Sequence, residues 1–155
     1  YAPLGAVADA AMDAAWARLI CGATEREEHL DVKGRTLTIR RAARGAARFD
    51  FDELCARALG AADYIALARR YGTIFMDRIP AMEPAMRNEA KRFVTLVDAV
   101  YEARTKFVCS AAAEPEGLYL DGDGAFEFAR AASRLMEMRS TDYLGAEHVA
   151  PAAAE

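Results

Sequence analysis

The sequence predicts an α/β fold, in which a sheet containing a βαβ unit is flanked by helices and preceded by an N-terminal helix and a β-hairpin. Three observations support this class. Apolar residues recur with a helical period over residues 6–20, they alternate with polar residues around Lys33-Gly34, and two short apolar segments, 73–76 and 106–110, enclose a long amphipathic stretch. Strands joined through a helix in this way run parallel.

Composition limits the class of protein further. The chain has 155 residues, of which 54% are hydrophobic and 28% charged, as in one soluble globular domain or two small ones. The net charge of -4 does not favour nucleic acid as a partner, and no apolar run reaches the ~20 residues of a transmembrane segment. Three cysteines without C-x-x-C spacing indicate a reducing, cytoplasmic location. Because Tyr1 is not a start residue, we expect a piece of a longer polypeptide.

Residues 1–45 are predicted to form the N-terminal helix and the hairpin. One face of the helix, with Trp16 beside it, is expected to be buried. The helix is expected to end at Gly22. The hairpin turns at Lys33-Gly34, and a basic link over residues 40–45 follows it. The residues of the expected stripe are Val7, Ala10, Ala11, Ala14, Ala15, Arg18 and Leu19.

Residues 46–144 are predicted to form the α/β region, and residues 145–155 a flexible tail. Asp50 and Glu53 have the spacing of a capping box, which starts a short helix. The expected elements are a strand over 47–51, helices over 52–57 and 61–71, a strand over 73–76, a helix over 84–101, a strand over 106–110 and a helix over 126–139. The last helix is expected to bury Phe128, Ala129, Ala132, Leu135 and Met136.

Few residues suggest catalysis, and no catalytic residue or metal ligand is assigned. His29 and His148 have no partners at ligand spacing. Asp77 ends an apolar strand, as acids that hold Mg²⁺ do, although a charged strand cap explains it equally well. Cys109-Ser110 lacks the glycines of a nucleophile elbow. None of the three lysines follows a glycine, so the chain contains no phosphate-binding G-x-x-x-x-G-K-[ST] loop.

Arg130 and Arg134 are the candidate nucleotide-binding residues. They are four residues apart on the last helix and therefore share a face. A guanidinium held by a packed helix suits a nucleotide phosphate, whereas the alternative is a solvent-exposed face on which Arg134 pairs with Glu137 or Glu127. A second basic group on the hairpin suits phosphate or an acidic partner, or is simply solvated. It consists of Arg35, Arg40, Arg41, Arg44 and Arg48.

Four ordered motifs resemble the carboxyl-terminal half of the AFG-like, ZapE-type P-loop ATPases, with similarity from Tyr1 to Leu144 that includes the V-x-G-R turn at Val32 to Arg35. The motifs are FDFDELC from Phe49, ADYIALARRYGTIFMDRIP from Ala62, RFVTLVDAVYEARTKFVCSAA from Arg92 and SRLMEMRSTDYL from Ser133.

The resemblance implies an AAA-related ATPase that uses ATP and Mg²⁺, with its Walker motifs and first sensor upstream of this segment. It implies a role in cell division at the inner membrane, or in protein quality control for mitochondrial relatives. Its implied partners are proteins that include the division machinery, and a homo-oligomer is one implied form of the full-length protein. Arg134 is carried over as a sensor-like contact to nucleotide or to a neighbouring subunit.

Three functions are therefore weighed. The first is a portion of an ATP hydrolase that binds ATP through its upstream half, binds no cofactor tightly by itself and is inactive alone. The second is a noncatalytic protein-interaction module that uses the N-terminal helix and the basic hairpin. The third is a small-molecule enzyme built on Asp77, Cys109 and Ser110, and it requires one pocket that contains all three side chains.

Overall fold

The computed structural model describes residues 1–149, which contain one five-stranded mixed sheet with helices on both of its faces. The strands lie in the sheet in their sequence order. They are β1 (Arg26–Val32), β2 (Arg35–Ala43), β3 (Ala46–Asp50), β4 (Thr73–Ile79) and β5 (Lys106–Ala111). The α-helices are α1 (Ala6–Ile20), α2 (Phe51–Cys55), α3 (Ala61–Arg70), α4 (Arg87–Ala103), α5 (Ala125–Glu137) and α6 (Thr141–Leu144), with 3-10 turns η1 (Pro84–Met86) and η2 (Pro115–Gly117). The predicted α/β class is confirmed.

Two tight turns connect the antiparallel strands β1, β2 and β3. Lys33 and Gly34 have φ of 48° and 78°, and Arg44 and Gly45 have φ of 51° and 75°. Positive φ at both central residues is the geometry of a type I′ turn, which matches the twist of the paired strands. The first turn was predicted from the sequence. The basic link predicted over residues 40–45 is wrong, because β2 continues to Ala43 and leaves only Arg44-Gly45 as the connection.

The other strands form two consecutive βαβ units. β3 pairs in parallel with β4, and β4 pairs in parallel with β5. The predicted unit over residues 73–110 is confirmed, with α4 as its crossover. The earlier unit, in which α2 and α3 connect β3 to β4, was not predicted. The capping box at its start is present, since the Asp50 amide donates to Glu53 Oε1 over 3.0 Å.

The sheet is continuous across residue 45. The proposed division into 1–45 and 46–144 therefore falls between two paired strands, β2 and β3, and stays a prediction. Part of the predicted tail contacts the rest of the chain: the Val149 amide donates to the Ala103 carbonyl over 2.9 Å, and Lys106 Nζ donates to the Ala146 carbonyl over 2.9 Å. Residues 150–155 lie outside the described part of the chain.

The larger part of the core lies on the face of the sheet covered by α2, α3, α4 and α5. Phe93 of α4 is fully buried, with ring centroids 6.2 Å from Phe51 and 5.6 Å from Phe128. The predicted face of α5 is partly wrong. Ala129 and Met136 are exposed, whereas Ala131 is buried. The i, i+3, i+4, i+7 spacing of residues 128, 131, 132 and 135 turns that face toward α4.

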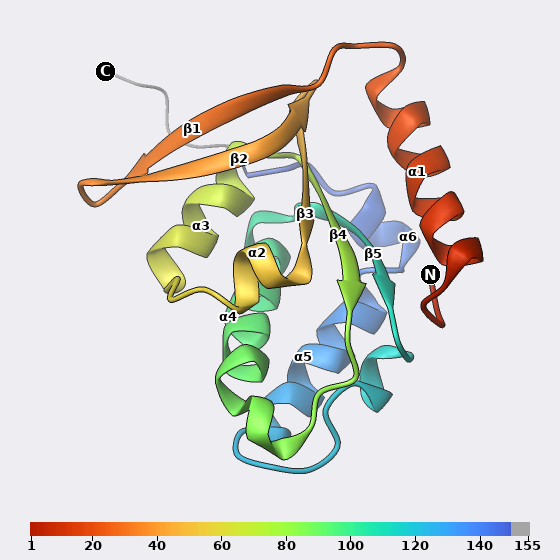
Figure 1. Cartoon of the computed structure of the whole chain (residues 1–155), viewed down its shortest axis with the longest axis vertical. Coiled ribbons are helices and arrows are strands. Elements are labelled where there is room, and N and C mark those ends of the chain that lie inside the picture. The colour runs from red at the N-terminus through yellow and green to blue at the C-terminus, as the bar shows by residue number, and fades with distance from the viewer. Residues whose placement is uncertain (150–155) are drawn as a thin grey trace.

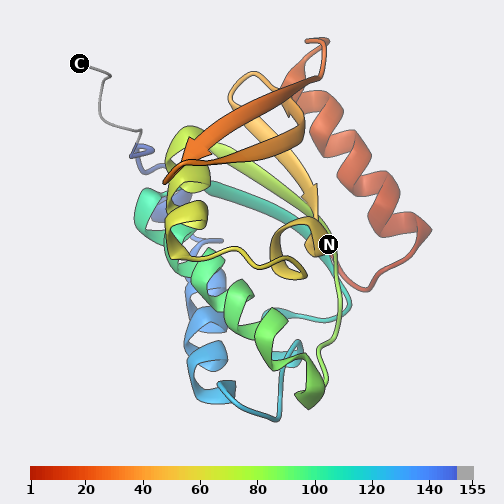
Figure 2. The same cartoon turned by 60° about the vertical axis from the view of Figure 1, so that its left-hand side comes forward.

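Helix α1 covers the opposite face of the sheet, apart from the other helices (Figures 1 and 2). The stripe predicted for it is wrong, because Val7 is 87% exposed and the buried residues are Ala8, Met12 and Trp16. Trp16 decides the orientation, since its ring packs edge-on against Phe75 with centroids 5.1 Å apart. No helix within residues 1–149 has both the length and the apolar character needed to cross a bilayer.

The hairpin of β1 and β2 extends over α3 (Figure 1), and polar contacts connect it to α3 and to Tyr71 at the end of that helix. Arg35 Nη2 donates to both carboxylate oxygens of Asp63 over 2.7 Å, and the hydroxyl of Tyr71 donates to Glu28 Oε1 over 2.7 Å. Burial acts to raise the pKa of Asp63, but hydrogen bonds from the Gly60 amide and Arg35 outweigh it and hold this pKa below its ordinary 3.8. The buried carboxylate is therefore stabilised in its charged form.

Replacing Asp63 by Asn is expected to lower the free energy of unfolding at pH 7 by about 1–2 kcal/mol, because the amide keeps the Gly60 bond and loses the pair with half-exposed Arg35. A folded pKa below 3.8 means that the pair contributes fully at neutral pH and progressively less as the pH falls below about 4. Urea unfolding of both proteins at several pH values measures this. A difference that is constant from pH 7 to pH 3 would contradict it.

Candidate functional site

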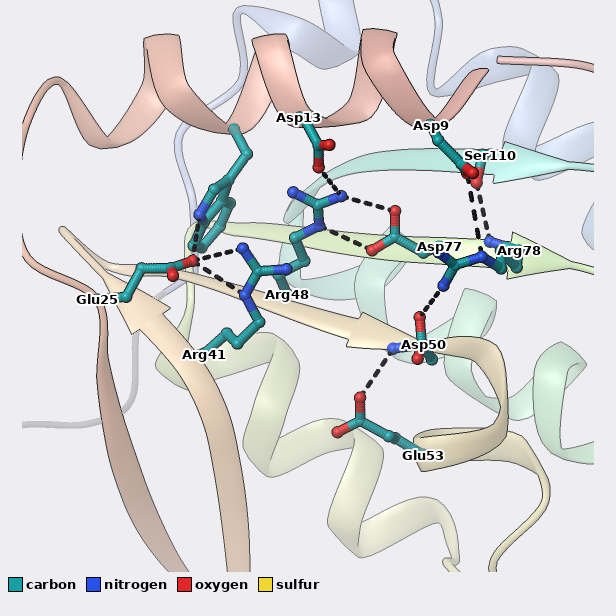
Figure 3. A network of polar contacts seen from close by, with 11 residues as sticks. Asp9, Asp13, Glu25, Arg41, Arg48, Asp50, Glu53, Asp77, Arg78 and Ser110 are labelled. Atoms are coloured by element: carbon teal, nitrogen blue, oxygen red, sulfur yellow. Dashed lines mark hydrogen bonds and ion pairs between the residues drawn. The ribbon is translucent and has the colours of Figure 1, made fainter. Parts of the chain in front are cut away.

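A network of charged side chains lies between α1 and the sheet (Figure 3), with Arg48 of β3 at its centre. Arg48 Nε donates to Asp77 Oδ2 over 2.7 Å and its Nη2 to Asp77 Oδ1 over 2.9 Å, which makes the pair bidentate. Nη2 also donates to Asp13 of α1 over 2.8 Å. Arg48 and Asp77 are each 5% exposed. The ion pair thus connects two neighbouring parallel strands and the helix above them.

Arg48, one of the arginines for which a solvated surface was the alternative, is instead buried. Ala46 and Arg48 alternate toward α1, while Ala47 and Phe49 face the larger core, so both faces of β3 are covered. Burial opposes the charge of Arg48, but its bonds to Asp77 and Asp13 outweigh that effect and raise the pKa of the guanidinium. Its remaining nitrogen, Nη1, is buried without a hydrogen-bond partner among residues 1–149.

Three further ion pairs lie on the two sides of Arg48 (Figure 3). Arg78 Nη1 lies 3.0 Å from Asp50 Oδ1, and its Nε lies 4.0 Å from Asp9 of α1. On the other side, Glu25 pairs with Arg41 over 2.8 Å and accepts a hydrogen bond from the indole of Trp16. Acids in and just after α1 therefore meet three arginines of the sheet.

The strand-end candidates do not converge on one pocket. Asp77 is engaged by Arg48, and Ser110 Oγ accepts a hydrogen bond from the Arg78 amide over 2.8 Å. Cys109 lines a cavity of about 150 Å³ that neither Asp77 nor Ser110 lines, and burial raises the pKa of its thiol, which disfavours the reactive thiolate. Within residues 1–149, no three His, Cys, Asp or Glu residues are placed to hold a metal ion. The strand-cap interpretation of Asp77 is the one that its contacts support.

Arg134 lies in a small cluster between α4 and α5. Its Nη1 is 2.6 Å from Asp98 Oδ1, and its guanidinium lies over the ring of Tyr101, 4.9 Å from the centroid. The predicted pairing of Arg134 with Glu137 or Glu127 is wrong, because Asp98 is its partner, and Glu137 instead accepts from the Tyr101 hydroxyl over 2.8 Å. Arg134 remains 29% exposed along its side chain. Arg130, one turn earlier, is exposed.

Most of the predicted basic group on the hairpin is neutralised by acids. Arg35, Arg41 and Arg48 are paired with Asp63, Glu25 and Asp77 respectively. Arg40 and Arg44 are exposed and make no ion pair within residues 1–149. The surface that a partner could meet is therefore much smaller than the sequence suggested.

Neither histidine joins the network. His29 Nε2 lies 3.3 Å from Glu27 at the exposed hairpin, and His148 Nε2 lies 2.7 Å from the Ala68 carbonyl. His29 Nδ1 also lies 3.4 Å from the Thr38 hydroxyl oxygen, and neither imidazole belongs to a group of three metal-ligating side chains within residues 1–149.

A family model described as AFG1-like ATPase matches residues 1–147. The chain belongs to this family. It is 37% identical over 148 residues to the protein named cell division protein ZapE of Escherichia coli strain K12, a match that covers 96% of this chain and 40% of that protein. It is 35% identical over 117 residues to lactation elevated protein 1 homolog B of Danio rerio, covering 76% of this chain and 23% of that protein. No solved structure matches the chain.

This AFG1-like ATPase chain thus spans less than half the length of the curated relatives it matches. The described residues contain a charged network around Arg48 and an arginine, Arg134, held between two helices. Asp13 and Arg48 were not predicted as partners of Asp77. An arginine within an apolar strand, followed by a parallel strand that ends in an acid, was the signal that could have identified the buried pair.

Replacing Arg48 by Met is expected to lower the free energy of unfolding by about 3–5 kcal/mol, because it leaves the Asp77 carboxylate buried without a partner. The double substitution Arg48→Met with Asp77→Leu removes both charges and is expected to regain most of that loss. Urea unfolding followed by circular dichroism measures both. A double variant as unstable as Arg48→Met alone would show that the pair itself is not the cause.

Proposed function

We propose that this chain is the carboxyl-terminal portion of an ATP-hydrolysing, ZapE-type ATPase of the AAA-related P-loop class, and that it does not hydrolyse ATP by itself. The observation that supports this is the family match over residues 1–147 with 37% identity to the Escherichia coli protein. The family implies that ATP and Mg²⁺ are used by the full-length protein, through polypeptide outside this chain.

The residues of this chain do not fit Mg²⁺ and a triphosphate without that polypeptide. No glycine precedes a lysine in the sequence, so there is no loop of the kind that cradles phosphates. The strand-end acid that such a site would use, Asp77, is held by Arg48. We therefore assign no step of hydrolysis to the side chains described here.

Arg134 is the residue that we propose to contact nucleotide or a neighbouring subunit of a homo-oligomer, with Arg130 beside it. Asp98 and the Tyr101 ring hold its guanidinium in one orientation while leaving the side chain partly accessible. A preoriented guanidinium binds phosphate oxygens with little loss of conformational entropy. Arg130, exposed on the same helix, adds a second positive charge within one turn.

In the cell, we propose a cytoplasmic protein at the periphery of the inner membrane that acts with partners of the division machinery. The name of the Escherichia coli relative supports cell division. Protein quality control is the alternative setting for the same ATPase.

In the full-length protein, Arg134→Ala is expected to reduce ATP turnover by about tenfold or more, since an arginine that reaches the reacting phosphate stabilises its developing charge. Arg134→Lys is expected to recover little, because the ammonium lacks the planar fork. Arg139→Ala is the matched control, because Arg139 is exposed and pairs with Glu114 at the surface. Unchanged ATP turnover and nucleotide affinity in the Arg134→Ala variant would contradict the proposed nucleotide contact of Arg134.

A second candidate function is protein interaction through the hairpin, favoured by the two exposed arginines Arg40 and Arg44. Charge reversal of both, Arg40→Glu with Arg44→Glu, is expected to abolish capture of a partner by the full-length protein while leaving its thermal stability unchanged, because neither side chain makes an ion pair within residues 1–149. Reversal of Arg35, which pairs with Asp63, serves as the control that lowers stability. Full retention of the partner by the double variant would rule out this surface.

A further inference from the structure

Helix α1 is apolar on the side that faces away from the sheet. Its buried side is Ala8, Met12 and Trp16. The outward side carries an exposed seam, which consists of Val7, Ala10, Ala14 and Ala17. Spacings of three and four residues place these four side chains in one line along the helix.

The charged residues of α1 lie outside that seam. Asp9 and Asp13 pair with Arg78 and Arg48 of the sheet, although the Asp13 side chain stays 71% exposed, and Arg18 is the remaining charged residue of the helix. A helix with apolar residues on both sides is typical of one that is covered on both sides. The seam alone does not say what covers it.

The outer edge of β5 supplies an independent observation. The amino group of Tyr1 donates to the Cys109 carbonyl over 2.7 Å, and the Ala111 amide donates to the Tyr1 carbonyl over 2.8 Å. Two bonds from one residue to positions 109 and 111 are the pattern of a strand that runs parallel to β5. Since alternate amides of a strand point to the same edge, those of Phe107 and Cys109 face outward like that of Ala111.

A cavity of mixed polarity adjoins this edge. Its volume is about 150 Å³, and its lining includes Tyr1, Phe107, Cys109, Leu135 and Met138 together with the charged residues Glu114 and Arg139. Side chains of a strand placed beside β5 would project toward it, because the residues of one strand alternate between the two faces of the sheet. Helix α1 runs alongside β5 (Figure 1) and contacts it, so polypeptide that follows the outer edge of β5 would pass next to α1.

We propose that the α1 seam and the outer edge of β5 form one intramolecular interface, covered in the full-length protein by the polypeptide that precedes Tyr1, which adds a further parallel strand beside β5. This rests on the proposed function in one respect, that the chain is a carboxyl-terminal portion. The length of the relatives supports the occupant, since the matched 148 residues are only 40% of the Escherichia coli protein. The direction of the Tyr1 pairing carries the preceding residues along β5 toward Lys106.

Cysteine accessibility in the full-length protein tests the seam. In a background with Cys21→Ser and Cys109→Ser, a single cysteine is placed at Ala10 or Ala14, or at exposed Ala129 of α5 as the control. Buried Cys55 stays in place. Maleimide labelling at positions 10 and 14 is expected to be at least tenfold slower in the native protein than in urea, whereas position 129 labels at nearly its urea rate.

Labelling at positions 10 and 14 as fast as in urea would overturn the proposal. Protection that disappears on hundredfold dilution would also overturn the proposal, because a second copy would then be the occupant.

Hydrogen exchange resolved at single amides tests the added strand. The amides of Phe107 and Cys109 are expected to exchange as slowly as that of Val108, and fast exchange at Phe107 and Cys109 would contradict the proposal. ATP turnover is measured on the same variants. Turnover without protection at positions 10 and 14 contradicts the proposed interface, whereas absence of turnover contradicts the proposed ATPase function.

Discussion

The buried pair between Arg48 and Asp77 is the interaction on which the arrangement of the sheet and α1 depends. Removing two charges from water is costly, and the bidentate geometry offsets that cost only if both strands keep their present register. Asp13 adds the requirement that α1 lie in one position across the strands. Trp16 against Phe75 and the small cluster around Met12 then complete a second, minor core. The polar contacts therefore fix the placement of a helix whose own apolar pattern specifies no single face.

The larger core on the other face follows from ordinary packing. Two consecutive βαβ units have right-handed crossovers, which place α3 and α4 on the same side of the strands. Phe93 contacts aromatic rings of both α2 and α5, so α4 is the layer through which the other helices meet. Within residues 1–149, this division leaves one face of the sheet densely covered and the other covered by α1. Any coupling between the sheet and the rest of a longer polypeptide is most direct on the face of α1.

Sequence patterns predicted the helices and strands that have a clear hydrophobic period. They did not predict the face or partner of a residue that is set by tertiary contacts. The hairpin turn at Lys33-Gly34 and the unit over residues 73–110 have local signals, which is why both were predicted. The face of α1 was predicted wrongly because its many alanines give almost no amphipathic contrast, and the position of one large side chain, Trp16, settles it. The partner of Arg134 was also missed. Helical spacing suggests partners on the same helix, whereas Asp98 comes from α4, and nothing local in the sequence indicates that neighbour.

The contact between Arg134 and Asp98 constrains what this arginine can do. A guanidinium already paired at 2.6 Å can bind a phosphate only by sharing donors with the carboxylate or by exchanging one anion for the other. The five N–H donors of arginine make sharing feasible, because Asp98 occupies Nη1 and the ring of Tyr101 lies against the face of the group. Asp98 and Tyr101 would then act as positioning residues that hold the fork while its free edge meets the phosphate. An arginine with this support loses less conformational entropy on binding than exposed Arg130, so the proposed phosphate contact fits position 134 better than position 130.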